Sequence, residues 1–328
     1  MVSRISSGWL LTSLVALVIA SIVWALAAGS VALGWSQLAG ILAGDTTLAG
    51  YDVVWKLRWP RVTTGLLVGG MLALAGAQMQ VLLRNPLADP YILGVSGGAA
   101  VGALLALLLG GGRGVMAIMT AVGACVSVFI VFGLSHGRGS WSSTRLLLTG
   151  VVLAAGWGAL ISFMLAIGPD GTLRGMLFWL MGDLGYSEPS AWSVAILGVG
   201  LALSLWLARS LNLLAYGDLQ AAALGVPVFR VRVILYFVGS LLTAAAVMLA
   251  GSVGFVGLVV PHALRLLGAG DHRVLFPAAV LLGGGFLVVA DTLARTVLAP
   301  QQIPVGVVTA FIGVPVFLML LYRGGRGV

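Results

Sequence analysis

The residues best suited to chemistry in this sequence are arginines at the ends of hydrophobic segments. Arg58 and Arg61 precede one such segment, and Arg295 ends another, four residues after Asp291. A guanidinium forms paired hydrogen bonds with a carboxylate and so fixes its orientation. Three such groups on one face are typical of a docking surface for acidic side chains of a soluble partner. Snorkelling towards lipid headgroups, or an Asp291–Arg295 ion pair, would explain them equally well.

A second candidate is the polar segment of residues 216–232. Residues 217–232 of this segment, GDLQAAALGVPVFRVR, predict a short helix with Asp218 as its N-cap and with Gly225 and Pro227 at its end. A loop with such an ordered helix is typical of a surface that contacts another protein. An ordinary interfacial helix is the alternative interpretation. The residues concerned are Asp218, Leu219, Gln220, Ala221, Ala222, Ala223, Leu224, Gly225 and Val226.

The third candidate is the segment RNPLADPYILGVSGG, which begins at Arg84. Pro86 and Pro90 interrupt its backbone, and the glycines at its end permit close helix approach. Broken elements inside a membrane bundle can line or gate a pathway. Gly94–Gly97 also resembles the serine motif of rhomboid intramembrane proteases, which would need a buried histidine to activate Ser96.

The remaining titratable residues argue against other function classes. His136 and His272 fall in predicted loops and His262 on a short helix, which disfavours the protease. An ion-coupled carrier usually needs a buried carboxylate. Asp291 is the candidate here, and pairing with Arg295 would neutralise its charge, which disfavours the carrier. No phosphate-binding loop or acidic cluster for Mg²⁺ is present, and there is one cysteine. We therefore expect no catalytic residues, no bound metal and no cofactor, so that energy for transport would come from another subunit.

The elements that position these residues belong to a membrane protein. Hydrophobic residues make up 60% of the chain and charged residues 8%, against roughly 25% charged in soluble domains. The net charge of +8 comes from basic residues scattered between apolar runs, a pattern of membrane-surface loops rather than of nucleic-acid binding. The composition predicts an all-α polytopic membrane protein, with residues 1–328 forming one transmembrane domain.

Ten transmembrane helices are predicted from the hydrophobic runs. Residues 62–83 include no ionisable group and would extend about 33 Å, enough for a bilayer core of about 30 Å. Glycines at 251–254 predict a break before a short eighth helix, and LRGMLFWLMGDL predicts an interfacial helix. The ten helices are placed at roughly 9–33, 62–83, 91–109, 115–134, 145–170, 190–208, 233–249, 255–267, 274–298 and 305–322.

The charge distribution predicts that both termini lie in the cytoplasm. With ten crossings and an inner N-terminus, eleven of the 17 basic residues face inside and six face outside. The positive-inside rule favours this orientation. Arg58, Arg61 and Arg295 then lie outside, whereas residues 84–89 and 216–232 lie inside.

Motifs along nearly the whole chain resemble the FecCD-type permeases, the membrane subunits of ABC importers for iron chelates, haem and cobalamin. In order they are RWPR, AGAQMQ, RNPLADPYILGVSGGA, TRLLLTGV, AAALGV, GFVGLVVPHALRLLGAGDHR, LADTLAR and IPVGVVTAFIGVPVF. The resemblance implies type II ABC importer architecture with ten helices. It also implies a homodimer in the bacterial inner membrane, whose two copies enclose one pathway lined mainly by the fifth and tenth helices.

The resemblance further implies partners and roles. A periplasmic binding protein would dock outside on Arg58, Arg61 and Arg295. Two copies of a cytosolic ATPase, which use ATP and Mg²⁺, would each meet residues 218–226 inside. The cytoplasmic gate maps onto Asn85, Leu87, Ser142, Ser143 and Thr144. The overall similarity is nearest to haem permeases, so haem is the expected solute, with a ferric siderophore or cobalamin as alternatives.

Overall fold

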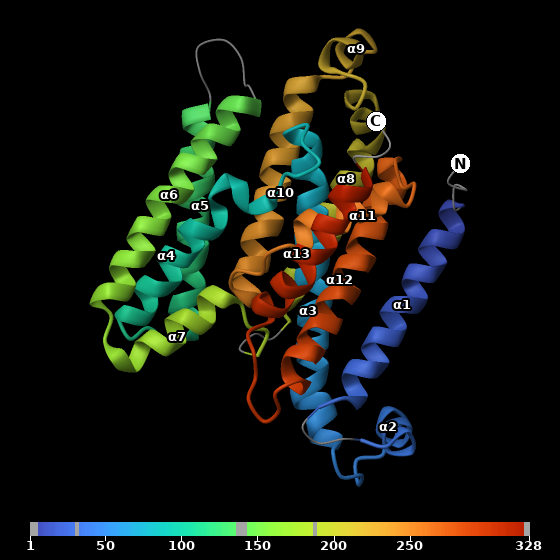
Figure 1. The fold of residues 1–328 in the computed structure, drawn as a ribbon, viewed down its shortest axis with the longest axis vertical. Helices are drawn as coiled ribbons and strands as arrows, with labels where there is room; N and C mark the ends of the chain where they lie inside the picture. Colours follow the sequence, from blue (N-terminus) through green and yellow to red (C-terminus); the bar gives the residue numbers. More distant parts are fainter. Residues whose placement is uncertain (1–5, 30–32, 136–142, 186–188, 325–328) are drawn as a thin grey trace.

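The computed structural model describes residues 6–29, 33–135, 143–185 and 189–324, and their regular structure is entirely helical. The elements are α1 (Ser7–Ala27), α2 (Trp35–Leu42), the π-helical η1 (Val53–Arg58), α3 (Trp59–Leu82), the 3-10 helix η2 (Pro90–Leu93), α4 (Val95–Leu108), α5 (Arg113–Ser135), α6 (Ser143–Ile167), α7 (Asp170–Met181), α8 (Ala191–Leu214), α9 (Asp218–Ala223), α10 (Val228–Ala250), α11 (Val256–Leu266), α12 (His272–Thr296) and α13 (Val305–Gly324). Figure 1 shows them as one elongated bundle with short helices at its two ends.

The apolar helices follow the order of the predicted spans. Within the described residues, seven are long and apolar enough to cross a membrane, namely α1, η1 with α3, α5, α6, α8, α10 and α12. Three shorter apolar helices, α4, α11 and α13, occupy the remaining predicted positions. Because α4 has 14 residues and α11 has 11, fewer than the about 20 of a full span, the number of crossings stays a prediction.

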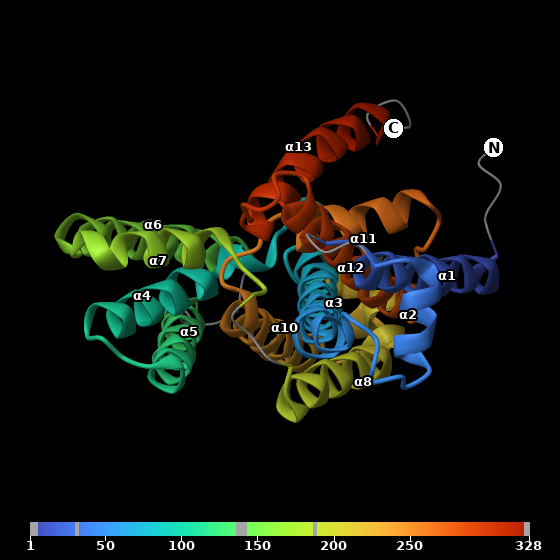
Figure 2. The same ribbon diagram turned by 90° about the horizontal axis from the view of Figure 1, so that it is seen from below.

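Helix α3 is the centre of the bundle, with α8, α10, α11 and α12 around it (Figure 2). Glycines make this packing possible. A Cβ atom on Gly69 would lie 2.1 Å from the carbonyl oxygen of Gly283, and one on Gly76 would lie 1.9 Å from that of Gly257. Small residues at helix crossings let backbones approach closely in a membrane. The glycines of α3 therefore fix where α11 and α12 lie.

The predicted break between the seventh and eighth helices is confirmed. Gly251 ends α10 with φ of 66° and ψ of −156°, a conformation that is essentially restricted to glycine. A Cβ atom there would also meet the carbonyl oxygen of Trp179 at 2.2 Å. The extended residues that follow bring the ends of α7, α10 and α13 together, since Asp183 donates its N–H to Ala250 and Val305 donates to Gly182.

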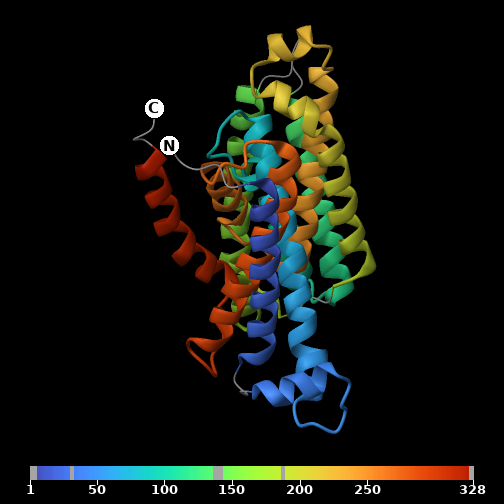
Figure 3. The same ribbon diagram turned by 90° about the vertical axis from the view of Figure 1, so that its right-hand side faces the viewer.

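The two ends of the bundle carry different short helices. α9 lies at one end and α2 at the other (Figures 1 and 3), and α7 lies obliquely below α4, α5 and α6, towards the α2 end (Figure 1). α1 begins and α13 ends towards the α9 end, as an inside–inside topology requires. The predicted interfacial helix at LRGMLFWLMGDL corresponds to α7, which begins at Asp170. We refer to the α9 end as the inner end and to the α2 end as the outer end.

Candidate functional site

At the outer end, two of the three predicted docking arginines share one carboxylate. Arg61 Nε lies 3.0 Å from Asp291 Oδ1, and Arg295 Nε lies 3.0 Å from Asp291 Oδ2. Arg61 also contacts Asp183 at 3.3 Å and donates to Gln302 Oε1 at 3.0 Å. The Asp291–Arg295 pair was predicted from its spacing and is confirmed. Asp183 and Gln302 were missed because they are 122 and 241 residues from Arg61.

Arg58, the third predicted docking arginine, caps the end of α1. Its side chain is buried, with the residue 4% exposed. Its Nη1 donates to the carbonyl oxygens of Leu26 at 2.5 Å and Ala27 at 2.9 Å. The last carbonyls of a helix lack partners within the helix and carry negative partial charge, so a guanidinium stabilises them. Arg58 therefore ties the start of α3 to the end of α1.

At the inner end, α9 presents an apolar surface to the outside of the bundle. Leu219 is 88% exposed, whereas Ala221 is fully buried and anchors the helix against its neighbours. Gly225, with φ of 83°, follows the helix as predicted. The N-cap prediction was wrong by one residue, because Gly217 with φ of 121° is the cap. The Asp218 carboxylate is consequently free of capping and pairs with Arg84 and Arg232.

The turn after α3 is ordered by its own side chains. Asn85 Oδ1 accepts a hydrogen bond from Leu87 N at 2.9 Å, and Asn85 N donates to the carbonyl of Gln80 at 3.1 Å. Leu87 is 41% exposed. Arg84 immediately before them has φ of 50°, which is rare for a residue with a side chain. This turn thus holds both predicted gate residues of its loop in one compact conformation.

The predicted gate residues between α5 and α6 are Ser142, Ser143 and Thr144, and the structure describes two of them. Ser142 lies outside the described residues, Ser143 begins α6, and Thr144 is exposed on the first turn of that helix.

Asp89 follows the turn that contains Asn85 and Leu87. Its carboxylate accepts a hydrogen bond from Tyr91 N at 2.8 Å. Burial raises the pKa of Asp89 to about 6, and this hydrogen bond acts in the opposite direction.

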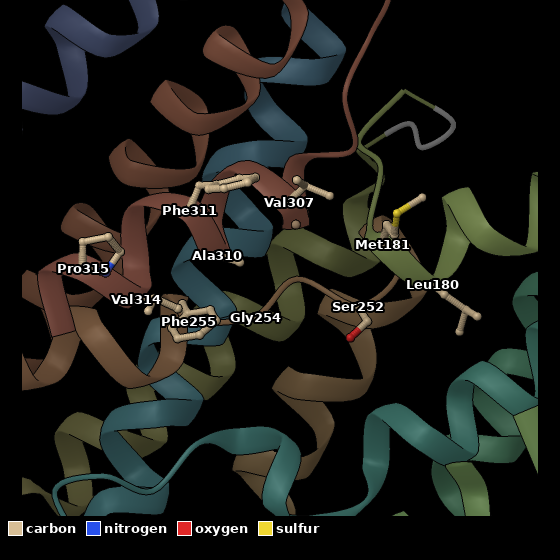
Figure 4. Close-up of a pocket in the computed structure, with 11 residues that line it drawn as sticks. Leu180, Met181, Ser252, Gly254, Phe255, Val307, Ala310, Phe311, Val314 and Pro315 are labelled. Carbon is tan, nitrogen blue, oxygen red and sulfur yellow. The ribbon is translucent and has the colours of Figure 1, made fainter. Parts of the chain in front are cut away.

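An apolar pocket of about 630 Å³ lies beside α13. Its lining comes from the end of α7, from residues 252–255 and from one face of α13 (Figure 4). Ser252 supplies the one polar side chain among the lining residues, and Phe311 on α13 is 77% exposed. α13 itself leans away from the other helices (Figures 2 and 3). Such a wall can pass a large solute without a strong polar contact.

Helix α6 shares this exposure. Its apolar side chains Leu148, Val152 and Phe163 are 60%, 71% and 60% exposed. In a single chain, α6 and α13 therefore both leave apolar faces uncovered. Exposed apolar faces of this extent mark contact with lipid or with another protein.

The geometry does not assemble a serine protease in the described part of the chain. The Ser96 hydroxyl donates to Ser252 Oγ at 3.3 Å. His262 packs on Phe317 and His272 contacts Asn212, so neither histidine is bonded to Ser96. The described residues also contain no group of three or more His, Cys, Asp or Glu side chains that could hold a metal ion.

Comparison with known proteins decides the family. The model of the FecCD transport family matches residues 17–323. This chain belongs to the FecCD transport family. It is a permease of a binding-protein-dependent ABC importer, which implies a dimer with ATPase and binding-protein partners. The family resemblance stated from the motifs is thereby confirmed.

Individual relatives cover most of the chain. It is 41% identical over 306 residues to the uncharacterised ABC transporter permease YvrB of Bacillus subtilis, covering 89% of this chain and 85% of YvrB. It is also 41% identical over 294 residues to the vitamin B12 import system permease BtuC of Escherichia coli O6:H1, covering 87% and 89% of the two chains.

Two solved structures resemble the fold. One is an ABC transporter assigned to the metal-chelate type, in an inward-facing conformation. It is 31% identical, with a TM-score of 0.84 over 97% of this chain and 100% of the other. The second, PsaBC from Streptococcus pneumoniae in complex with Fab, is 17% identical with a TM-score of 0.54, over 86% and 95% of the chains, and indicates the fold alone.

Proposed function

We propose that two copies of this chain enclose a pathway in the bacterial inner membrane that imports a bulky metal tetrapyrrole from periplasm to cytoplasm. The observation that carries the proposal is the apolar pocket against α13, on a face that a single chain leaves uncovered. Haem is a flat metal macrocycle with large apolar faces, and a wall of this kind offers it contact without a fixed ligand.

Within this solute class, haem and cobalamin are the two candidates. Haem is the solute expected from the sequence, and the nearly uniform apolar lining of the pocket suits its porphyrin faces. Cobalamin is favoured by a different observation, the 41% identity to a vitamin B12 import permease over most of both chains. The two differ in polarity and size, so transport assays separate them directly.

We assign docking of the binding protein to the outer arginines. Arg61 bonds to Asp291, Asp183 and Gln302, and Arg295 bonds to Asp291, Ala25 and Thr292. A guanidinium has five N–H donors, so each arginine keeps some of them for carboxylates of a partner. Arg58 would act mainly by holding the outer ends of α1 and α3 in place. The variant carrying Arg58→Glu and Arg61→Glu is expected to bind the binding protein more weakly at low salt, because like charges now repel. Unchanged affinity would refute this assignment.

We assign ATPase coupling to α9 and the residues up to Val226. The exposed Leu219 offers an apolar contact at the inner end. ATP binding and hydrolysis by the partner would shift α9 and so alternate the inner and outer gates. Removal of residues 218–226 is expected to detach the ATPase while the permease stays in the membrane. A complex that survives this deletion would contradict the assignment.

Reconstitution tests the proposed function. The permease, its cognate ATPase and its binding protein are placed in liposomes, and uptake of haem and of cyanocobalamin is measured with and without ATP. We expect uptake of one of them only when ATP and binding protein are both present. Uptake of neither solute would refute the proposed solute class, and uptake driven by an ion gradient without the ATPase would refute the importer mechanism.

A further inference from the structure

One ionic cluster at the inner end joins three parts of the chain that the proposed function treats separately. Asp218 on α9 accepts from Arg84, which lies next to the gate turn, and from Arg232 near the start of α10. The Arg232 Nη2 atom lies 2.9 Å and 2.8 Å from the two carboxylate oxygens of Asp218. One carboxylate therefore holds two guanidiniums that are 148 positions apart in the sequence.

From this geometry we infer that Asp218 and Arg84 form a mechanical link that carries movement of α9 to the turn at Asn85 and Leu87. The inference rests on the proposed function, in which α9 meets the ATPase and this turn belongs to the inner gate. Arg84 and Asp218 are positioning residues in this scheme, because they would act through α9 and the gate turn rather than on the solute or the nucleotide.

The flanks of α9 permit the movement that the link would carry. Gly217 and Gly225 have φ values of 121° and 83°, so that glycine stands at both junctions with the neighbouring helices. Glycine moves between backbone conformations at little steric cost. The helix between them has six residues and can shift as a unit relative to α8 and α10. Its displacement would move the Asp218 carboxylate with it.

The backbone of Arg84 can respond to that displacement. Its φ of 50° is unfavourable for a residue with a Cβ atom and is kept only where the surroundings hold it. Burial lowers the pKa of Arg84, and the charge of Arg232 lowers it further. Withdrawal of the shared carboxylate would leave these two cations facing each other. Arg84 would then move, and Asn85 follows it directly in the chain.

A purely structural role makes a different prediction. If the cluster only stabilised the inner end, removal of one arginine would lower stability without separating ATP hydrolysis from gate movement. If it is a link, Arg84→Gln leaves Asp218 held by Arg232, so that the ATPase stays bound, but the gate turn no longer follows α9. The distinguishing quantity is thus the response of the turn to nucleotide.

A cysteine reporter measures that response independently of the solute. Cys125, the one cysteine of the chain, is changed to Ser, and Leu87→Cys is labelled with a water-soluble maleimide in the ATPase complex. We expect ATP to change the labelling rate of the reporter protein about fivefold or more, in the range of ordinary allosteric coupling. With Arg84→Gln added, the rates with and without ATP should become equal while ATP hydrolysis continues.

Two further variants and a second readout complete the test. Arg84→Lys keeps the charge and should retain most of the response, and Arg209→Gln removes an exposed cation from the same end as a matched control with no effect. With the native Leu87 and Cys125, Arg84→Gln should also import less haem or cyanocobalamin per ATP hydrolysed. An unchanged labelling response or import ratio in Arg84→Gln overturns the link alone. A reporter protein that never responds to ATP overturns the gate assignment, and the link with it.

Discussion

Replacement of Asp291 by Asn tests the outer ionic network against a matched surface pair. Asp291 and Arg295 are four residues apart and 3.0 Å from each other, with side-chain exposures of 3% and 9%. Asp52 and Lys56 have the same spacing and the same 3.0 Å distance, but exposures of 69% and 72%. The two pairs thus share spacing and distance, but they differ in burial and in the second arginine, Arg61, that Asp291 also contacts.

The expected magnitudes follow from that difference. Removal of one partner of a buried pair costs about 3–5 kcal/mol because a charge is left without compensation. In Asp291→Asn the residual cations are Arg295 and Arg61, the latter also held by Asp183, so the lower part of this range applies. An exposed pair at this spacing contributes about 0.5 kcal/mol or less, and Asp52→Asn should be nearly neutral.

Equilibrium unfolding supplies the measurement. Each purified variant is titrated with SDS in mixed micelles, and the loss of helical signal gives the free energy of unfolding. We expect Asp291→Asn to lose at least about 2 kcal/mol more than Asp52→Asn. Equal losses in the two variants would show that burial of the Asp291 cluster does not govern its contribution to stability.

Three further predictions address packing, partner contact and pH. Gly76→Ala should destabilise the protein by about 1–3 kcal/mol because its Cβ would lie 1.9 Å from the Gly257 carbonyl oxygen, whereas Gly198→Ala, with open space around it, should not; equal unfolding midpoints would contradict this. Leu219→Ser should weaken ATPase binding about tenfold or more, measured by titration, since the 88% exposed side chain would lose its apolar burial; an unchanged Kd would exclude that contact. The pKa of Asp89 is raised to about 6 in the folded protein, against about 4 in the unfolded chain, so this residue favours folding below pH 4 and opposes it as the pH rises through 6. Asp89→Asn should therefore match the stability of the parent near pH 4 and exceed it by about 3 kcal/mol at pH 8. Parallel pH profiles of stability for the two proteins would contradict this.

Local patterns in the sequence predicted much of the fold. The i, i+4 spacing of Asp291 and Arg295 on one helix face predicted their pair, which the structure confirms. The glycines around Gly251 predicted the break before α11, since the backbone there adopts a conformation that side chains disfavour. These features depend on a few neighbouring residues, so they can be predicted from the sequence.

Long-range partners could not be predicted in the same way. Arg61 and Asp291 are 230 residues apart, and they meet because the glycines of α3 let α12 pack closely against it. The hydrophobic pattern of these helices does not show how each helix is rotated about its axis. The partners of Asp218 could not be predicted either, because they depend on which residue caps α9. The type and position of Asp218 suited an N-cap, but Gly217 occupies that place and leaves Asp218 for Arg84.

The most direct test of the proposed import function is the stimulation of ATP hydrolysis by a loaded binding protein. The reconstituted complex of permease and ATPase is given its binding protein empty, loaded with haem or loaded with cyanocobalamin. We expect one loaded form to raise the hydrolysis rate well above the rate with the empty form. Equal rates with empty, haem-loaded and cobalamin-loaded binding protein would contradict the proposed import function.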